Sequence, residues 1–312
     1  MNTRKKQPRW TFVYSIILLL FTIYFLLDTF VLPRSYQVVD GTTSAPEQLY
    51  TPSITDGQSP VTTARFTATP VLSEKSYSDQ NISILITEHR QYDSTIYVAD
   101  VLLSSPEYLK TAFAENTYGR NIKDQTSDIA QANDALFAVN GDFYGARNDG
   151  YVLRNGVLYR KDAATDQEDL VIWKDGTFKI IKEAEITATQ LWETGANQVF
   201  SFGPALIIDE AIMVSEKDYS GISTDNPRTA IGIVDNLHYF FVVSDGRTEQ
   251  SKGLSFYELA QFTKSLGVKT AYNLDGGGSS AMYFNGNTIN TPTADGDTIR
   301  ERRVSDIVYI RP

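Results

Sequence analysis

The stretch TAYNLDGGGSSAMYF, residues 270–284, places three consecutive glycines between two apolar, strand-like segments. Asp275 precedes the glycines and Ser279 follows them. Glycine has no Cβ, so such a run lets backbone amides approach a ligand closely, and concave amide runs suit anions and sugar hydroxyls. A nucleotide-binding P-loop needs a lysine and a helix after its glycines, whereas a second strand follows here. A glycine hairpin without a ligand is the alternative interpretation.

A second stretch has the same arrangement. FAVNGDFY contains Asn140 and Asp142 at the spacing of Asn273 and Asp275. Each Asn-x-Asp follows an apolar strand, and each is followed by a short strand with an Asn-Gly turn. We expect the two loops to face one cleft, each contributing one amide and one carboxylate. The alternative is that these side chains only cap turns.

A third element is NPRTAIGIVDNLHYFFVVSDGR, residues 226–247, which is typical of a β-hairpin. A two-residue Asp-Asn turn would place Arg228 opposite Val243 and close to Asp245 and Arg247. The functional interpretation is a guanidinium fork for phosphate or carboxylate, a geometry that lysine does not provide. The alternative is a surface salt bridge of little energetic value.

The rest of the chain predicts strands with few helices. Segments 81–89 and 94–104 alternate like paired strands, and 105–115, with an early proline, is expected to form a short helix. A second helix is predicted after Ser255, which has capping-box spacing to Glu258. The expected fold class is α+β, a mixed and mostly antiparallel sheet domain with few helices.

The N-terminus predicts a membrane segment. Basic residues precede a long apolar run in which only Asp28 is charged, and the run is long enough to cross a bilayer. The positive-inside rule places the N-terminus in the cytoplasm and the body outside, as a single-pass protein of the cell membrane. A cleaved signal peptide is the alternative. We therefore expect a cytoplasmic head (1–10), a transmembrane anchor (11–32), a Ser/Thr/Pro-rich stalk (33–75) and one domain (76–312).

Composition excludes several classes of function. The chain has no cysteine and two histidines, which excludes disulfides, thiolate metal sites and a histidine-rich zinc site. The net charge is −10, and residues 1–34 hold five cations against one acid, so the remainder carries −14. Such an acidic body is not expected to bind nucleic acid.

The motifs NGDFY, NPRTAIGI, SDGR and NLDGGGSSAMY, in this order, resemble the phosphodiester glycosidase family. The resemblance extends from about residue 82 to residue 310. It implies hydrolysis of the bond between the anomeric carbon of a sugar and a phosphodiester oxygen. Bacterial members are often labelled exopolysaccharide-related proteins, which implies a role in envelope or exopolysaccharide metabolism. The matching positions that look like active-site positions are Asp142, Arg228, Asp245, Asp275, Gly277 and Ser279.

These observations predict an extracytoplasmic hydrolase with a glycosyl-phosphodiester or polysaccharide substrate. Asp275 is the expected principal catalytic carboxylate and Asp142 its partner, with Asp245 as a third candidate. No cofactor is expected. The alternatives are a glycan-binding or envelope-assembly module without turnover, and a phosphodiesterase whose three aspartates bind Ca²⁺ or Mg²⁺. The expected substrate-binding residues are Asn140, Arg228, Arg247, Asn273, Gly276, Gly277, Gly278 and Ser279.

Overall fold

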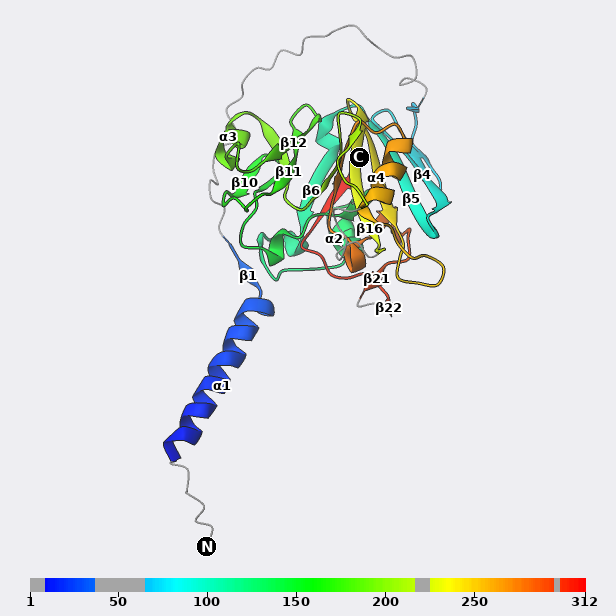
Figure 1. Cartoon of the computed structure of the whole chain (residues 1–312). Helices are drawn as coiled ribbons and strands as arrows, with labels where there is room; N and C mark the ends of the chain where they lie inside the picture. The colour runs from blue at the N-terminus through cyan, green and yellow to red at the C-terminus, as the bar shows by residue number, and fades with distance from the viewer. Residues whose placement is uncertain (1–8, 37–64, 217–224, 295–297) are drawn as a thin grey trace.

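The computed structural model describes residues 9–36, 65–216, 225–294 and 298–312 (Figure 1). A nine-stranded sheet forms one wall of the body, and its described strand pairings are antiparallel. In spatial order its strands are β15 (Ala211–Ile212), β14 (Ala205–Ile208), β18 (Thr270–Asn273), β16 (Arg228–Asp235), β17 (His238–Ser244), β5 (Ser94–Leu103), β4 (Ile82–Gln91), β3 (Ser76–Ser78) and β2 (Val71–Leu72).

Two five-stranded antiparallel sheets complete the body. The second sheet has the order β20 (Asn287–Thr288), β19 (Met282–Phe284), β8 (Phe137–Asn140), β23 (Asp306–Ile310) and β6 (Leu109–Phe113). The third has the order β10 (Val157–Arg160), β9 (Val152–Arg154), β13 (Ala196–Phe200), β11 (Glu168–Trp173) and β12 (Phe178–Lys182). Two short ribbons pair β1 (Arg34–Ser35) with β7 (Gly119–Arg120) and β21 (Thr293–Ala294) with β22 (Thr298–Ile299).

Four α-helices lie in the described ranges: α1 (Arg9–Phe30), α2 (Thr126–Ala132), α3 (Ala188–Glu193) and α4 (Phe256–Ser265). Four 3₁₀ turns accompany them: η1 (Pro106–Tyr108), η2 (Ala114–Asn116), η3 (Tyr144–Ala146) and η4 (Gly277–Ser279). The predicted capping box of α4 is present, because Ser255 Oγ accepts from the Glu258 amide and the Glu258 carboxylate accepts from the Ser255 amide. The predicted α+β class with mostly antiparallel sheets is confirmed.

The main core lies between the nine-stranded and second sheets. The rings of Phe137 on β8 and Phe241 on β17 meet there at a centroid distance of 5.0 Å. Helix α4 covers the opposite face of the nine-stranded sheet with Leu259 and Phe262, and α2 covers the opposite face of the second sheet with Ile129. The layers therefore run from α4 through two sheets to α2, and the third sheet, with α3, packs beside them (Figure 1).

The predicted helix over 105–115 was wrong. Its first residues form only the 3₁₀ turn η1, and Leu109–Phe113 continue as strand β6. β6 pairs with β23, about 200 residues later in the chain, from Leu109 opposite Ile310 to Phe113 opposite Asp306. Partners so distant in sequence override the local helix signal.

Helix α1 is the segment predicted to enter a membrane. Phe12–Phe30 has a mean hydropathy of 2.0, and none of it is buried against the body. Length and composition suit a membrane-crossing segment, and a signal sequence near the N-terminus has the same properties. Most of the predicted stalk (37–64) lies outside the described residues, whereas Arg34 and Ser35 pair with β7 and Val71 and Leu72 form β2. The segment boundaries stay a prediction.

Candidate active site

The two Asn-x-Asp loops meet at one edge of the body. Asn140 Nδ2 donates to the Asp275 carbonyl at 2.7 Å, and the Asp275 amide donates to the Gly141 carbonyl at 3.2 Å. Asn140 Oδ1 accepts from Thr229 Oγ1 at 2.7 Å. Asn140 is fully buried and holds the loops together. Its side-chain amide is therefore not open to a ligand, whereas the sequence predicted that it would bind substrate.

Asp275 is largely buried, with 10% of its side chain exposed. Its Oδ2 accepts from Ser279 Oγ at 2.6 Å and from Arg302 Nη2 at 3.0 Å, and its Oδ1 accepts from the Gly276 amide at 2.8 Å. Burial raises the pKa of Asp275, while Arg302 and the hydrogen bonds oppose that rise. The carboxylate is thus fixed in position and made more basic than an exposed one.

Each glycine of the run lies against a different arginine. A Cβ on Gly276 would lie 3.8 Å from Cδ of Arg228, one on Gly277 2.7 Å from Nη2 of Arg247, and one on Gly278 3.3 Å from Cβ of Arg302. Gly277 therefore lets Arg247 approach the loop, whereas the atoms nearest to a Cβ on Gly276 or Gly278 belong to Pro227 and Ala294.

Two of the three glycine amides that were expected to bind a ligand have partners inside the protein. The Gly276 amide donates to Asp275 Oδ1, and the Gly277 amide donates to the Pro227 carbonyl at 2.8 Å. These amides stabilise the η4 turn, and the positive groups beside it are guanidinium groups.

Arg228 lies at the start of β16, opposite Ser244 rather than Val243. The predicted register was one residue out, because the turn residues are Asn236 and Leu237 rather than Asp235 and Asn236, and a bulge between Ile233 and Asp235 takes up one residue. The Arg228 guanidinium lies 3.9 Å from the ring centroid of Phe256, and its Nε donates to the Leu254 carbonyl at 2.9 Å. Its Nη2 is buried without a hydrogen-bond partner among the residues that the structure describes.

Arg247 follows the end of β17 in a left-handed conformation, with φ of +62°. Its Nε and Nη2 both donate to Asn226 Oδ1, at 3.1 and 3.0 Å. Burial and the charge of Arg247 lower the pKa of Arg228 to about 10. Two cations that repel one another beside a buried, unpartnered N–H form a site suited to an anion.

Asp142 points into the interior instead of toward Arg228. Its Oδ2 accepts from Arg154 Nη2 at 2.8 Å and from the Ser201 amide at 3.0 Å, and its Oδ1 accepts from the Tyr144 amide at 3.0 Å. The Asp142 side chain has no exposed surface. This burial argues against the predicted role of Asp142 as a carboxylate that touches substrate.

Arg154 also binds Asp306, which has no exposed surface either. Burial raises the pKa of Asp306 to about 8; Arg154 lowers that pKa, and Asp142 and Asp275 raise it. The buried triad of Asp142, Arg154 and Asp306 is connected to the Asp275 loop through Gly141. The Gly141 amide donates to the Asp306 carbonyl at 2.8 Å, and the Gly141 carbonyl accepts from the Asp275 amide.

Asp245 is likewise used internally. Its Oδ1 accepts from the Thr291 amide at 2.8 Å and from Asn290 Nδ2 at 3.2 Å, which ties the end of β17 to the segment before β21. Burial raises the pKa of Asp245, and these hydrogen bonds oppose the rise. Within the described ranges no three His, Cys, Asp or Glu side chains gather to hold a metal ion.

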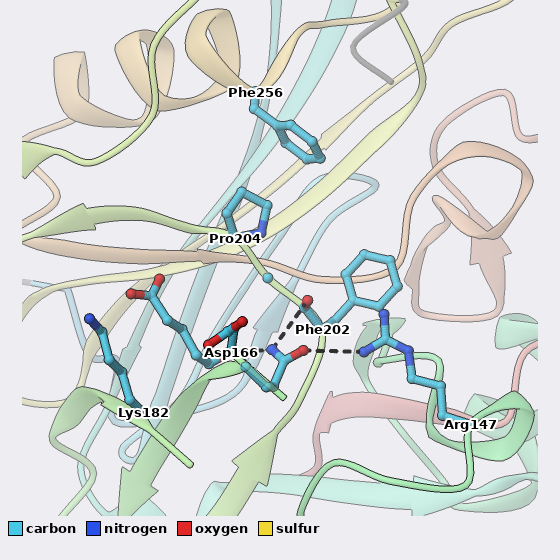
Figure 2. A pocket seen from close by; sticks show the side chains of 9 residues that line it. Arg147, Asp166, Lys182, Phe202, Pro204 and Phe256 are labelled. Carbon is cyan, nitrogen blue, oxygen red and sulfur yellow. Dashed lines mark hydrogen bonds between the residues drawn. The ribbon is translucent and has the colours of Figure 1, made fainter. Parts of the chain in front are cut away.

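A cavity of about 540 Å³ lies beside Phe256 and is not lined by Arg228, Arg247 or Asp275. The ring of Phe256 stacks on Arg228 and lines one side of the cavity, and Pro204 and Phe202 line the adjacent side (Figure 2). Asn273 supports this wall, since its Nδ2 donates to the Gly203 carbonyl at 2.8 Å; its Oδ1 has no hydrogen-bond partner in the described parts of the chain. The remaining lining side chains include Arg147, Asp166, Gln167, Glu168 and Lys182.

Sequence reasoning missed Arg302, Arg147 and Phe256. Arg302 lies in a run of charged residues without a motif, and its contact with Asp275 depends on the return of the chain after β22. Arg147 stacks over Phe202 at 5.1 Å from the ring centroid. Phe256 is the first residue of α4, and the capping box that starts the helix was the only signal that located it.

Comparison with known proteins indicates the family of this chain. Residues 133–311 match the family model described as phosphodiester glycosidase. A Bacillus subtilis protein, the SPbeta prophage-derived uncharacterized protein YomE, is 31% identical over 201 residues, which cover 62% of this chain and 30% of that protein. The human N-acetylglucosamine-1-phosphodiester alpha-N-acetylglucosaminidase is 28% identical over 185 residues, which cover 53% of this chain and 35% of the human one. The matches therefore span about a third of these relatives' length.

Among solved structures, the catalytic domain of the zebrafish N-acetylglucosamine-1-phosphodiester alpha-N-acetylglucosaminidase, auto-inhibited by its pro-peptide, is similar with a TM-score of 0.60. That alignment has 19% identity and covers 80% of this chain and 86% of the zebrafish chain. A hypothetical protein from Synechocystis aligns with a TM-score of 0.53 at 14% identity, over 75% of this chain and 63% of that one. These two likenesses concern the fold. Since the family model covers more than half of the sequence, this chain belongs to the phosphodiester glycosidase family.

Proposed function

We propose that this protein hydrolyses glycosyl phosphodiesters, with the phosphate held by Arg228 and Arg247 and the anomeric carbon facing Asp275. The observation that carries the proposal is the buried Nη2 of Arg228, which has no partner among the described residues and lies beside a second guanidinium. A Cβ on Gly276 would lie 3.8 Å from Cδ of Arg228, and Gly276 directly follows Asp275, so we place the anion next to this carboxylate. An anionic leaving group next to one accessible carboxylate fits the chemistry of the family.

In the proposed reaction the bond between the sugar C1 and the phosphate oxygen breaks, and its electron pair stays on that oxygen. The phosphomonoester leaves with this added negative charge, which the arginines stabilise more strongly than they stabilise the bound diester. A water oxygen becomes bonded to C1, and Asp275 assists either by accepting the water proton or by attacking C1 before water does. A phosphate leaving group needs little proton donation, so one accessible carboxylate is sufficient.

Asp142 and Asp245 are proposed as positioning residues. Asp142 holds Arg154, and through the Asp306 backbone this triad fixes the loop that meets Asp275. Asp245 fixes the end of β17, two residues before Arg247. The side chains of both are hydrogen-bonded inside the protein, and we assign neither a proton-transfer role.

The cavity beside Phe256 is proposed to hold the glycan. Phe202 and Phe256 offer aromatic faces, and Gln167, Asp166 and Glu168 offer hydrogen-bonding groups (Figure 2). Apolar rings with a few polar groups are typical of small-molecule sites. We further propose that α1 is a retained signal anchor, with the N-terminus inside and the catalytic domain outside the cell membrane, where envelope or exopolysaccharide glycans are the available substrates.

A test uses the full-length protein and two soluble probes, a UDP-sugar and a synthetic sugar 1-phosphodiester of a simple alcohol. Release of the free sugar together with UDP or with the phosphomonoester supports the proposed hydrolysis. Incorporation of ¹⁸O from labelled water into the sugar, and not into the phosphate, identifies cleavage at C1. Saturable binding of both probes without product would instead support a glycan-binding module.

A further inference from the structure

The end of helix α1 is fixed directly to the domain. Only residues 31–33 separate α1 from β1, and an extended segment of three residues spans roughly 10 Å. β1 pairs with β7, where Arg34 lies opposite Arg120. Asn121 Nδ2 then donates to the carbonyls of Thr29 and Leu32, at 3.3 and 3.2 Å.

Aromatic packing strengthens this junction. The Tyr36 amide donates to the Tyr118 carbonyl at 3.0 Å, and the two rings lie 5.8 Å apart. Gly119 allows the approach, because a Cβ there would lie 2.0 Å from the Arg34 carbonyl oxygen. Residues 118–121 therefore hold the end of α1 against the body.

The same segment continues into the candidate active site. The Asn121 amide donates to the Gly145 carbonyl, close after Asp142. Lys123 Nζ lies 5.6 Å from the ring centroid of Phe143. Asp124 and Val304 exchange backbone hydrogen bonds at 3.0 and 2.8 Å, two residues after Arg302. Residues 118–124 thus touch α1 at one end and the segment that carries Arg302 at the other.

The direction of the strands places the site at this end of the body. β16 starts at Arg228 beside the site and runs to Asp235, and β17 returns to Ser244, so the turn at Asn236 lies at the far end. Eight residues of extended strand span roughly 25 Å. Figure 1 shows α1 leaving the body at the end where α2, β21 and β22 lie, and β21 packs against η4 of the glycine run.

We propose that the active site faces the bilayer and acts on a glycosyl phosphodiester whose alcohol part is a membrane lipid. This inference rests on the proposed function and on α1 as a retained anchor. The phosphate of such a lipid lies at the membrane surface, and the short connection after α1 keeps the site end of the domain at that surface. Hydrolysis there would leave the lipid as a phosphomonoester and release the glycan.

The orientation is tested without any measurement of activity. The chain has no cysteine, so Arg303→Cys, beside Arg302, and Asn236→Cys, at the far turn, each allow one fluorescent label on the full chain in vesicles. Energy transfer to acceptors on lipid headgroups should be strong from residue 303 and weak from residue 236. Equal transfer from both positions, or a protein that does not stay with the vesicles, would overturn the inference.

The substrate class is tested with one sugar 1-phosphate esterified either to a long-chain lipid in the same vesicles or to a short soluble alcohol. Confinement to a surface raises the effective substrate concentration, so we expect the lipid ester to be cleaved at least about ten-fold faster at equal bulk concentration. A ten-residue Gly/Ser insertion between Leu32 and Pro33 should reduce this preference several-fold and leave the soluble rate unchanged. The matched control is the same insertion in the exposed turn Asp209–Glu210, which should change neither rate.

The outcomes separate the two proposals. Cleavage of the soluble ester without any preference for the lipid ester contradicts the membrane inference and leaves the hydrolase proposal standing. If neither ester is cleaved, the hydrolase proposal is contradicted, and with it the lipid ester as substrate. The two labels still decide which end of the domain faces the bilayer.

Discussion

Arg302 Nη2 donates to Asp275 Oδ2 at 3.0 Å and at the same time to Ser279 Oγ at 2.6 Å. The arginine thus holds both the carboxylate and the hydroxyl that binds it. This contact lowers the pKa of Asp275 against the opposing effect of burial. It therefore sets the pH range in which Asp275 is ionised.

Arg302→Gln should shift the acid limb of the kcat/KM profile to higher pH. Asp275 is active as the carboxylate, its pKa is raised by burial, and loss of a neighbouring positive charge raises the pKa further. We expect a small shift, because Arg302 is partly exposed and solvent screens its charge. Arg302→Lys keeps the charge and should shift the limb less. An unchanged acid limb in the glutamine variant would show that Asp275 does not determine it.

Arg228→Lys should lower kcat/KM by about 100-fold. Lysine keeps a positive charge but lacks the planar guanidinium that stacks on Phe256 and presents Nη2 to the anion. Inhibition by inorganic phosphate should weaken in the same variant, which connects the loss to anion binding. Arg311→Lys, an exposed site at the C-terminus, is the control and should behave as wild type. Normal phosphate inhibition in Arg228→Lys would place the anion elsewhere.

Gly277→Ala should reduce activity beyond what its backbone strain explains. Gly277 has φ of +61°, and its new Cβ would lie 2.7 Å from Arg247 Nη2, so the guanidinium must move. Gly286→Ala is a matched control, since Gly286 has φ of +88° and no atom within 4 Å of a built Cβ. Both variants should lose about 1 kcal/mol of unfolding free energy from the left-handed conformation. A fall in kcat/KM is expected only for Gly277→Ala, and equal kinetics for the two would contradict the role of Arg247.

Asp306→Asn should flatten the dependence of stability on pH. The pKa of Asp306 is about 8 in the folded protein and about 4 in an unfolded chain, so between these values the folded state binds a proton that the unfolded state releases. The unfolding free energy of the wild type should therefore fall as pH rises from 5 to 8, by about 1 kcal/mol per pH unit from this group. Urea denaturation of both proteins across this range measures the difference. Parallel curves would show that Asp306 does not hold a proton.

Local patterns predicted much of this fold. The turns of the β9–β10 and β19–β20 hairpins have positive φ at Asn155 and Gly156 and at Asn285 and Gly286, as their Asn-Gly sequences require. The capping box at Ser255 is also a local sequence signal, and it located the start of α4. Strand β6 was missed because β23, its partner, is distant in sequence and local propensity contains no information about it.

The site was predictable in its residues but not in their orientation. The equal spacing in the two Asn-x-Asp motifs correctly brought the loops together, yet Asp142 turns inward to Arg154 while Asp275 stays near the surface. That difference follows from Arg154, whose position depends on the packing of the third sheet against the second. The contact of Arg302 with Asp275 likewise depends on tertiary structure and has no local signal.

The most direct test of the account is the turnover of a soluble sugar 1-phosphodiester by the wild type and by Asp275→Asn. The account predicts free sugar and phosphomonoester from the wild type and a loss of at least about 1,000-fold in kcat for the variant, because the amide can neither accept a proton nor attack C1. The asparagine oxygen can still accept from Ser279 and Arg302, whereas its NH2 group cannot accept from the Gly276 amide, so the thermal midpoint should fall while the protein stays folded. A folded Asp275→Asn protein with wild-type turnover would contradict the account.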